Sequence, residues 1–512
     1  SGRMTVMSRS PLTGTVGDGS VGGSFGTMLK KAGWDGIVIT GRSPRPCGIE
    51  IDGEEVQLTD AAGMYGLLTS QIFDRLRGRG AAAATGPAAE NGVAFANIMV
   101  DGHFAAGRNG LGLSFAAKNL RYLTVKGHGK VAVADPEGLQ DAVEDVRRLL
   151  SASPALLGEF GIAEFGTPAL YDLMHARRMM PTENFRATFF PAASSLNAPA
   201  LRERYRPKKT GCRGCPILCK KVAADGRSLP EFETLSHFTA LLGNADLETA
   251  MAANRLCNEM GMDTISAAAT LACHTEIEQV KLSSVEILSL LDMIGRGKGI
   301  GAELGRGSAA YASSRGRPDC AVTVKGQELP AYDPRGACGM ALAYATSTRG
   351  GCHLRAYPIA HEILRKPVAT DRMSFDGKAR IIKIAEDLNA AIDSLTACKF
   401  VFFTASMEEY AKVFRAVTGV FASAQDLLKI GERIVYRERM MNARNGFNAA
   451  DDDLPARFFV MPGSEVGHIR VPPLDRTTFL EARSRYYAVR GLDVAGMPTR
   501  EKAVELGILW KG

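Results

Sequence analysis

The stretch Gly211-Cys212-Arg213-Gly214-Cys215-Pro216-Ile217-Leu218-Cys219 places three cysteines in one short loop with the spacing Cys-x2-Cys-x3-Cys. Soft thiolate sulfurs are the ligands that iron prefers in a cubane cluster, and a fourth ligand usually comes from a distant part of the chain. Structural zinc and unligated thiols are the two alternatives for such a loop. We therefore predict a metal centre here, with an iron-sulfur cluster as the favoured occupant.

Two competing metal sites fit the residues less well. A radical adenosylmethionine cluster uses the reverse spacing, Cys-x3-Cys-x2-Cys. Zinc normally needs a second close pair of Cys or His ligands. The nearest histidine, His237, lies in a helix-like stretch at 232–242, where an ordinary structural histidine is expected. An iron-sulfur cluster is therefore favoured over zinc as the occupant of the cysteine loop.

Length and composition indicate a folded multidomain protein. The chain has 512 residues, 46% hydrophobic and 23% charged, which predicts two or three domains. The net charge of +7 is not concentrated in a run of Lys or Arg, so nucleic acid is a poor default partner, whereas an acidic protein partner fits. No stretch approaches the roughly 18 consecutive apolar residues of a membrane span. Ten cysteines in so long a chain, without signal-peptide features, indicate reduced thiols or metal ligands and a cytoplasmic protein.

Sequence texture predicts an α+β multidomain fold. Residues 1–133 are rich in glycine and contain β-like runs at 36–40 and 48–51, which predicts a β-rich domain. Two mainly α-helical domains are predicted to follow, at 134–328 and 329–512. Their helices are expected at 137–150, 247–260, 285–294 with Ser284 as its cap, 379–389 and 425–441.

Further motifs accompany the cysteine loop in order along the chain. They are the segments 10–14, 101–108, 261–266, 329–336, 349–353 and 393–398. On these motifs, the sequence resembles the tungsten-dependent aldehyde:ferredoxin oxidoreductase family over nearly its whole length. The resemblance implies a [4Fe-4S] cluster and one tungsten or molybdenum ion held by the dithiolene sulfurs of two pterins. It also makes the β-rich domain a pterin-binding domain, and allows a magnesium ion bridging the pterin phosphates.

The resemblance also implies the residues that bind the pterins. Glycine-rich loops suit this work because bare backbone approaches phosphate oxygens closely. Carboxylates at Asp263 and Asp393 are suited to accept hydrogen bonds from pterin ring nitrogens, and Arg349 and Arg355 are suited to phosphate or pterin oxygens. The complete predicted set is Arg3, Ser20, Gly22, Arg108, Asn109, Leu111, Gly112, Asn258, Met262, Asp263, Arg349, Arg355, Asp393, Ala397 and Lys399.

Cys398 matches the fourth cluster ligand of the family, beside Cys212, Cys215 and Cys219. Its neighbours Ala397 and Lys399 match pterin contacts, so the cluster and a pterin are expected to be close. Arg3 matches a residue between the two groups, where its positive charge would tune the potential of the cluster. The other six cysteines have no predicted ligand role.

Glu233 and His353 match the family's active-site acid-base pair. A glutamate here would take a proton from water, and a histidine would stabilise negative charge on the substrate oxygen. The resemblance therefore implies oxidation of aldehydes to carboxylic acids, with electrons passing through the cluster to ferredoxin or a partner electron-transfer subunit. Reduction of a carboxylic acid or thioester is the alternative within the family. A cofactor-poor interaction subunit and a zinc-stabilised binding module are the alternatives outside it.

Three departures from the family pattern stand out. About 70 residues of the family's first domain have no counterpart before Ser1, so the chain is expected to be a fragment or to be completed by a second chain or copy. Segment 252–255 lacks the Glu-x-x-His pair that binds iron at a dimer interface in some relatives, so no such metal is predicted. Asn258 replaces an acidic residue and Ser20 replaces an asparagine at pterin contacts. Pterin affinity or pterin type is expected to differ accordingly.

Overall fold

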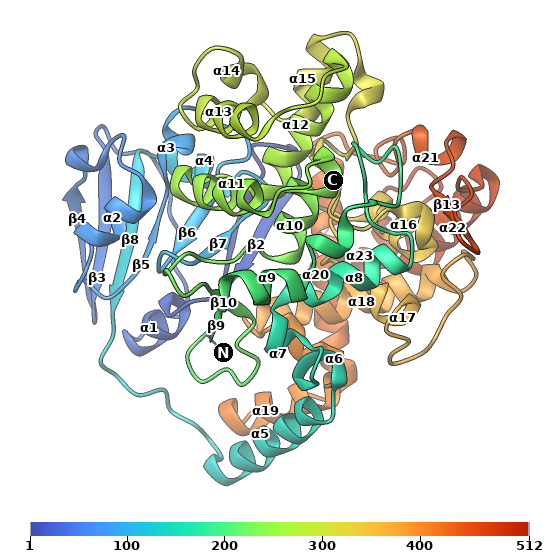
Figure 1. The fold of residues 1–512 in the computed structure, drawn as a ribbon. Helices are drawn as coiled ribbons and strands as arrows, with labels where there is room; N and C mark the ends of the chain where they lie inside the picture. The colour runs from blue at the N-terminus through green and yellow to red at the C-terminus, as the bar shows by residue number, and fades with distance from the viewer. Residues whose placement is uncertain (1, 510–512) are drawn as a thin grey trace.

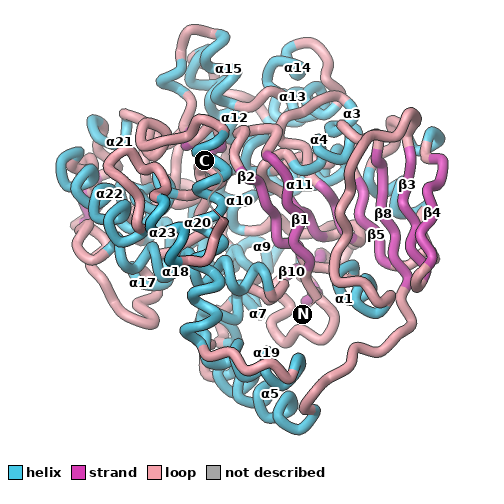
Figure 2. Tube along the Cα trace, turned by 180° about the vertical axis from the view of Figure 1, so that it is seen from behind, coloured by secondary structure: helices cyan, strands magenta, loops and turns pink. Residues whose placement is uncertain are grey.

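The computed structural model describes residues 2–509. Residues 1 and 510–512 of the predicted first and third domains lie outside this range. A six-stranded mixed sheet stands on one side of the molecule, and helices make up most of the remainder (Figures 1 and 2). The prediction of an α+β fold with a β-rich N-terminal part is confirmed.

The main sheet has the strand order β4-β3-β8-β5-β6-β7, in which only β3 and β8 run parallel. Tyr122 of β8 faces Gly48 of β3, and a Cβ on Gly48 would come within 2.1 Å of the Tyr122 ring, so glycine is required there. The strand bounds are β3 Cys47–Asp52, β4 Glu55–Asp60, β5 Ala81–Ala84, β6 Ile98–Val100, β7 Phe104–Ala106 and β8 Leu120–Lys126. The predicted strand at 48–51 is therefore confirmed as part of β3.

The predicted β-run at 36–40 is wrong. These residues form no strand, and Val38 is 91% exposed. An extended segment needs a neighbouring strand to accept and donate its backbone hydrogen bonds, and within residues 2–509 nothing pairs with this one. Apolar, β-branched residues alone are therefore not sufficient to make residues 36–40 a strand.

A separate antiparallel hairpin, β1 (Met4–Arg9) with β2 (Val16–Val21), joins the β-rich part to the helices. The backbone N–H of Val16 donates to Asn442 Oδ1 in α20 (Ala424–Arg444) at 2.9 Å. Thr5 Oγ1 donates to the carbonyl of Asp393 in α18 (Lys378–Ser394) at 3.1 Å. The remaining helices of this part are α1 Phe25–Lys31, α2 Thr69–Arg75, α3 Pro87–Glu90 and α4 Leu111–Ala116.

The helical part packs around one large hydrophobic core that contains residues from Ala88 to Ile508. Its core shows no break at the predicted 328/329 boundary, and the three-domain division stays a prediction. Its elements up to residue 328 are α5 Pro136–Ser151, α6 Pro154–Leu157, α7 Ile162–Phe165, α8 Leu170–Ala176, α9 Ala198–Tyr205, β9 Lys208–Thr210, β10 Lys220–Val222, α10 Phe232–Phe238, α11 Leu247–Met260, α12 Thr264–Glu278, α13 Ser284–Gly295, α14 Ile300–Leu304, α15 Ser308–Ser314, β11 Thr323–Val324 and β12 Gln327–Glu328.

Most of the C-terminal helices lie on the side of the molecule opposite the six-stranded sheet (Figure 1). Their bounds are α16 Cys338–Thr346, α17 Ile359–Glu362, α18 Lys378–Ser394, α19 Met407–Thr418, α20 Ala424–Arg444, α21 Arg457–Val460, α22 Arg476–Arg490 and α23 Arg500–Glu505, with a short hairpin of β13 Glu465–Val466 and β14 Ile469–Arg470. All five helices predicted from the sequence are present. The cap of α13 is Ser283 rather than Ser284, because Ser283 and Glu286 form a reciprocal capping box.

Candidate active site

A cavity of about 1750 Å³ lies between the β1–β2 hairpin, the cysteine loop and the C-terminal helices. It is lined by Glu233, His353, all four predicted cluster cysteines and twelve of the fifteen predicted cofactor residues. The exceptions are Asn109, Gly112 and Met262, which lie behind the wall. The structure thus brings together residues that are up to about 400 positions apart in the sequence.

The three exceptions support the wall from the core. Asn109 is buried and donates through Nδ2 to the Gln327 side chain and to the Arg349 carbonyl. A Cβ on Gly112 would lie 2.3 Å from the Asn97 carbonyl oxygen, so glycine lets α4 approach this segment. Met262 is fully buried.

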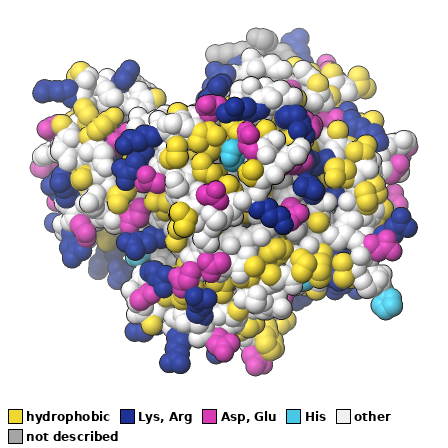
Figure 3. Space-filling model, turned by 45° about the horizontal axis from the view of Figure 1, so that its top comes forward, with side chains coloured by type: hydrophobic (Ala, Val, Ile, Leu, Met, Phe, Trp, Pro, Cys, Tyr) yellow, Lys and Arg dark blue, Asp and Glu magenta, His cyan; other side chains and the backbone are white. Residues whose placement is uncertain are grey.

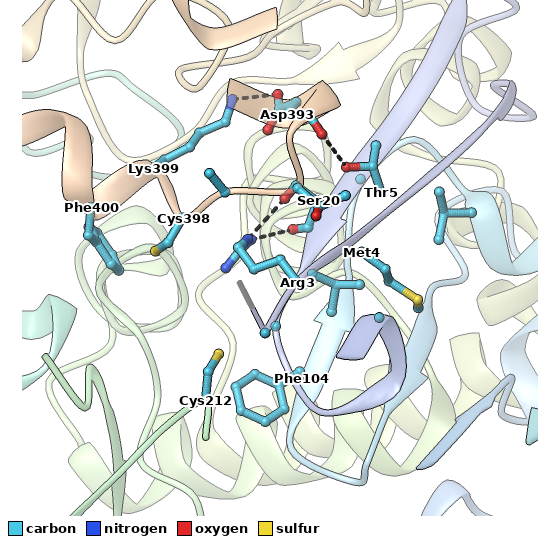
Figure 4. Close-up of a pocket in the computed structure, with 18 of the residues that line it drawn as sticks. Arg3, Met4, Thr5, Ser20, Phe104, Cys212, Asp393, Cys398, Lys399 and Phe400 are labelled. Carbon is cyan, nitrogen blue, oxygen red and sulfur yellow. Dashed lines mark hydrogen bonds and ion pairs between the residues drawn. The ribbon is translucent and has the colours of Figure 1, made fainter. Parts of the chain in front are cut away.

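The cysteine loop is the turn of the β9–β10 hairpin, and all three of its cysteines are partly exposed. Cys398 comes from the other side of the cavity, at the start of the 3-10 helix η7 (Lys399–Phe403). Arg3 lies between Cys212 and Cys398 in Figure 4 and donates to the Ser20 hydroxyl at 3.0 Å and the Ser20 carbonyl at 2.7 Å. Within residues 2–509, no three His, Cys, Asp or Glu side chains form a ready-made site for a single metal ion.

Gly22 brings the end of β2 close to the cysteine loop. A Cβ at this position would lie 2.9 Å from Cys212 Sγ and 2.9 Å from the Phe104 ring. Any larger residue would push the β1–β2 hairpin away from the cysteines. Glycine is therefore needed here for close approach of the chain to Cys212 and Phe104, and its contact with a pterin stays a prediction.

Asp263 and Arg108 hold one wall of the cavity together. The Asp263 carboxylate caps α12 by accepting from the backbone N–H groups of Ile265 and Ser266. It also lies 3.3 Å from Arg108 Nε. The other two Arg108 nitrogens donate to the carbonyls of Gly351 and Glu328, at 3.0 and 2.6 Å. Both predicted cofactor residues thus have fixed positions.

Asp393 presents an unused acceptor at the cavity. Its Oδ2 is 2.9 Å from Lys399 Nζ (Figure 4). Lys399 Nζ also donates to the Leu354 carbonyl. Its buried Oδ1 has no hydrogen-bond partner among the described residues. A buried carboxylate oxygen without a donor is costly in the protein alone, so this atom is suited to accept from a ligand N–H.

Arg349 and Arg355 are bound to carboxylates that the sequence analysis did not single out. Asp18 Oδ1 lies 3.2 Å from Arg349 and 2.8 Å from Arg355, and Glu438 lies 2.8 Å from Arg355. Burial alone would raise the pKa of Asp18, but the two guanidinium groups hold it below its usual value. Arg355 Nε is buried without a partner within residues 2–509, whereas Arg349 is fully engaged.

Cys352 is a buried acceptor next to His353. Its sulfur accepts from Arg349 Nε at 3.0 Å, Arg349 Nη2 at 2.8 Å and the Leu354 backbone N–H at 3.2 Å. Burial would raise the pKa of the thiol, but Arg349 lowers it below the usual value. Cys352 had no predicted role, and it anchors both ends of the turn that carries His353.

Replacing Cys352 with Ala is expected to destabilise the fold by about 2–4 kcal/mol, because it leaves buried Arg349 donors without their acceptor. Urea unfolding measures the change. Cys257→Ala is the matched control, since the Cys257 sulfur is fully buried and has no hydrogen-bond partner in the described chain. That control should cost only about 1–2 kcal/mol. Equal costs for the two variants would contradict the anchoring role of Cys352.

Glu233 and His353 meet at the cavity. Glu233 Oε1 lies 3.3 Å from His353 Nε2, and Glu233 Oε2 accepts from the Ala331 backbone N–H at 2.6 Å. Burial raises the pKa of Glu233 to about 8. Burial and the nearby positive charges of Arg108 and Arg349 hold the pKa of His353 well below its usual value, so its ring is neutral. Glu233 Oε1 and His353 Nδ1 are buried without hydrogen-bond partners in the described chain.

Aromatic rings surround this pair. Tyr332 lies against His353 with ring centroids 5.4 Å apart, and its hydroxyl is 3.1 Å from that of Tyr357. Tyr357 in turn contacts Phe402 and Phe403. These residues were not predicted as part of the site, because aromatic side chains scattered over about 70 positions carry no local sequence signal. His237 is buried with Nε2 3.2 Å from the Leu329 carbonyl, which is the structural role expected for it.

Comparison with known proteins identifies the family. Residues 1–127 match the N-terminal domain of aldehyde ferredoxin oxidoreductase, and residues 141–508 match domains 2 and 3. The chain belongs to the aldehyde ferredoxin oxidoreductase family. It is 36% identical to the tungsten-containing aldehyde ferredoxin oxidoreductase of Pyrococcus furiosus and 35% identical to that of Thermococcus kodakarensis. Each alignment covers 99% of this chain and 87% of the relative. The prediction of an oxidoreductase of this family is confirmed.

Two more distant proteins that this chain resembles have other activities in their names. The WOR-like subunit of an aliphatic sulfonate oxidoreductase from Pyrococcus furiosus is 25% identical, over 99% of this chain and 85% of the relative. The BamBC active-site complex of benzoyl coenzyme A reductase shares the fold, with a TM-score of 0.80, 20% identity, and coverage of 99% of this chain and 86% of the other. Among the described residues, no helix has the length and apolar character needed to span a membrane.

Proposed function

We propose that this chain oxidises aldehydes to carboxylic acids, using a tungsten or molybdenum bis-pterin centre and a [4Fe-4S] cluster. The observation that carries the proposal is the buried pair of Glu233 and His353, whose unpartnered Oε1 and Nδ1 belong to side chains lining the same cavity as four cysteines. The names of the relatives from Pyrococcus and Thermococcus support tungsten and aldehydes.

The residues at the cavity fit both the metal-pterin centre and the [4Fe-4S] cluster. Asp393 Oδ1 and Arg355 Nε are a buried acceptor and a buried donor without partners in the described chain, and both residues line a cavity with room for large cofactors. A [4Fe-4S] cluster takes four thiolate ligands, and the four cysteines line the same cavity. A bound metal-pterin centre supplies the two-electron oxidation.

The protein side chains supply proton transfer and polarisation. Aldehyde and water give carboxylic acid, two protons and two electrons. Glu233 Oε1 accepts a proton from the attacking water once the carboxyl is ionised. The neutral His353 ring donates from Nδ1 to the carbonyl oxygen. Its unprotonated Nε2, 3.3 Å from Glu233 Oε1, accepts a hydrogen bond from the Glu233 carboxyl once that group has taken the proton. The aromatic rings of Tyr332 and Tyr357 pack against His353 and line the same cavity.

The rate of aldehyde oxidation is expected to rise with pH through about 8. Because burial raises the pKa of Glu233 to about 8, most molecules carry a protonated, inactive carboxyl below that pH. The value of kcat/KM should therefore fall about tenfold per pH unit on the acid side. A profile measured from about pH 6 to pH 9 that stays flat would contradict a base with this pKa.

Anaerobic assays with an aldehyde and an uncharged small electron acceptor test the proposal. Formation of the carboxylate with reduction of the acceptor is the expected result. Reduction of a carboxylic acid or thioester, without detectable aldehyde oxidation, would instead support the alternative activity. No turnover from protein that contains both cofactors would contradict the proposed function.

A further inference from the structure

The segment before and into the cysteine loop is strongly basic. Residues 202–213 read Arg-Glu-Arg-Tyr-Arg-Pro-Lys-Lys-Thr-Gly-Cys-Arg, with six cations and one carboxylate. All six cations are exposed. The segment contains no long uninterrupted run of Lys or Arg, as the sequence analysis states, but its six cations lie within twelve residues, interleaved with Tyr205, Pro207 and the loop residues.

The fold places these charges around the cysteine loop. Helix α9 ends at Tyr205, Arg206 adopts a left-handed conformation, and the chain then enters β9, which pairs with β10. Lys208 and Lys209 lie on β9, and Arg213 follows Cys212 directly. In Figure 1 the hairpin lies beside α9 and α7 on the lower side of the molecule. The basic residues thus form a rim beside the cysteines, which we call the basic rim (residues 202–213).

Only part of this charge is neutralised by the protein itself. Lys209 is paired with Glu164, and Arg204 lies 3.3 Å from Glu248. Within residues 2–509, Arg206, Lys208 and Arg213 form no ion pair. Elsewhere the charges are mixed: on the face in Figure 3, cations and carboxylates are interspersed. The basic rim is therefore a local positive field.

We propose that the basic rim is the docking surface for an acidic electron-carrier protein, to which the cluster held by the adjacent cysteine loop passes electrons. This inference rests on the proposed function. Two electrons leave for each aldehyde oxidised, and a one-electron carrier accepts them in two encounters, each of which reduces one carrier. A positive rim beside an electron exit attracts a negatively charged partner, accelerates its association and orients it.

The other polyanion class, nucleic acid, fits the basic rim less well. Single strands bind to exposed aromatic platforms between the basic groups. The aromatic residue within the basic rim, Tyr205, is buried and donates to Glu248 at 2.8 Å. A small acidic protein needs only complementary charge and access to the loop.

The test is charge reversal with a matched control. The triple variant Arg202→Glu, Arg206→Glu, Lys208→Glu reverses three exposed cations that form no ion pair within residues 2–509 and that lie outside the cysteine loop and the cavity lining. The control Lys281→Glu, Lys298→Glu, Arg306→Glu makes the same charge change at exposed positions around α13 and α14, outside the cavity lining. The affinity of the holoenzyme for an acidic [2Fe-2S] ferredoxin is measured by biolayer interferometry at about 50 mM and 500 mM salt. Aldehyde oxidation is measured with an uncharged quinone.

The expected result is a loss of ferredoxin affinity of about tenfold or more at low salt in the rim variant, and little change in the control. Turnover with the quinone should be unchanged in both variants. Ferredoxin affinity within twofold of wild type in the rim variant, or an equal loss in the control, would overturn the proposal. Tighter binding of single-stranded DNA than of ferredoxin to the basic rim would also overturn it. Absent aldehyde turnover with intact, rim-dependent ferredoxin binding would contradict the proposed function instead.

Discussion

The Glu233→Gln variant should lose about 10²- to 10⁴-fold of kcat for aldehyde oxidation while keeping its cofactors. Glutamine has the shape of glutamate and can still accept from the Ala331 N–H, but it cannot take a proton from water. Because burial already disfavours the charged form of Glu233, with a pKa of about 8, the uncharged substitute should not destabilise the fold. Steady-state kinetics measure kcat, elemental analysis measures the cofactor content, and thermal unfolding measures the stability of the fold.

Glu303→Gln provides the control, because Glu303 is a surface carboxylate paired with Arg315 and does not line the cavity. Its activity should equal that of the wild type. The acid limb of the pH profile should also disappear from the residual activity of Glu233→Gln. Turnover of Glu233→Gln within about threefold of wild type, with full cofactor content, would exclude Glu233 as the base.

The second large effect is expected at Cys398. A serine hydroxyl is a poor ligand for cluster iron, so Cys398→Ser should lose most of its iron and its absorption near about 400 nm. Activity with any external acceptor should fall by about 100-fold or more, since electrons then have no route from the cavity. Iron analysis, visible spectra and turnover assays follow these changes.

Cys47→Ser is the matched control, because Cys47 is a buried thiol in β3 away from the cavity lining. This variant should keep its iron and its spectrum. A Cys398→Ser protein with the iron content and spectrum of wild type would remove Cys398 from the ligand set. Loss of zinc rather than iron would point to a structural metal.

Local elements of the fold could be predicted where the sequence signal is itself local. Helix α11 begins after Asp246, which caps it, and ends before Gly261 in a left-handed conformation, and its bounds were predicted to the residue. The segment 36–40 has equally suggestive residues but no strand beside it. A strand is stabilised by its neighbours, and single-sequence patterns do not contain them.

The residues of the candidate site also divide into those that a sequence signal reveals and those that only the folded structure reveals. Cysteine spacing indicated a metal loop directly, and the family resemblance supplied Cys398, Glu233 and His353, all of which line one cavity. The carboxylates that fix Arg349 and Arg355 were not predicted, because Asp18 is more than 330 positions from both arginines. The acceptor role of Cys352 depends on the turn that folds its sulfur back onto Arg349 and the Leu354 N–H, which no spacing rule reveals.

The most direct test of the central claim is elemental analysis of anaerobically purified protein by mass spectrometry, with tungsten, molybdenum, iron and zinc quantified per chain. We expect about four irons and one tungsten or molybdenum per chain, with little zinc. Zinc alone, or iron without either heavy metal, would contradict the proposed metal-pterin enzyme.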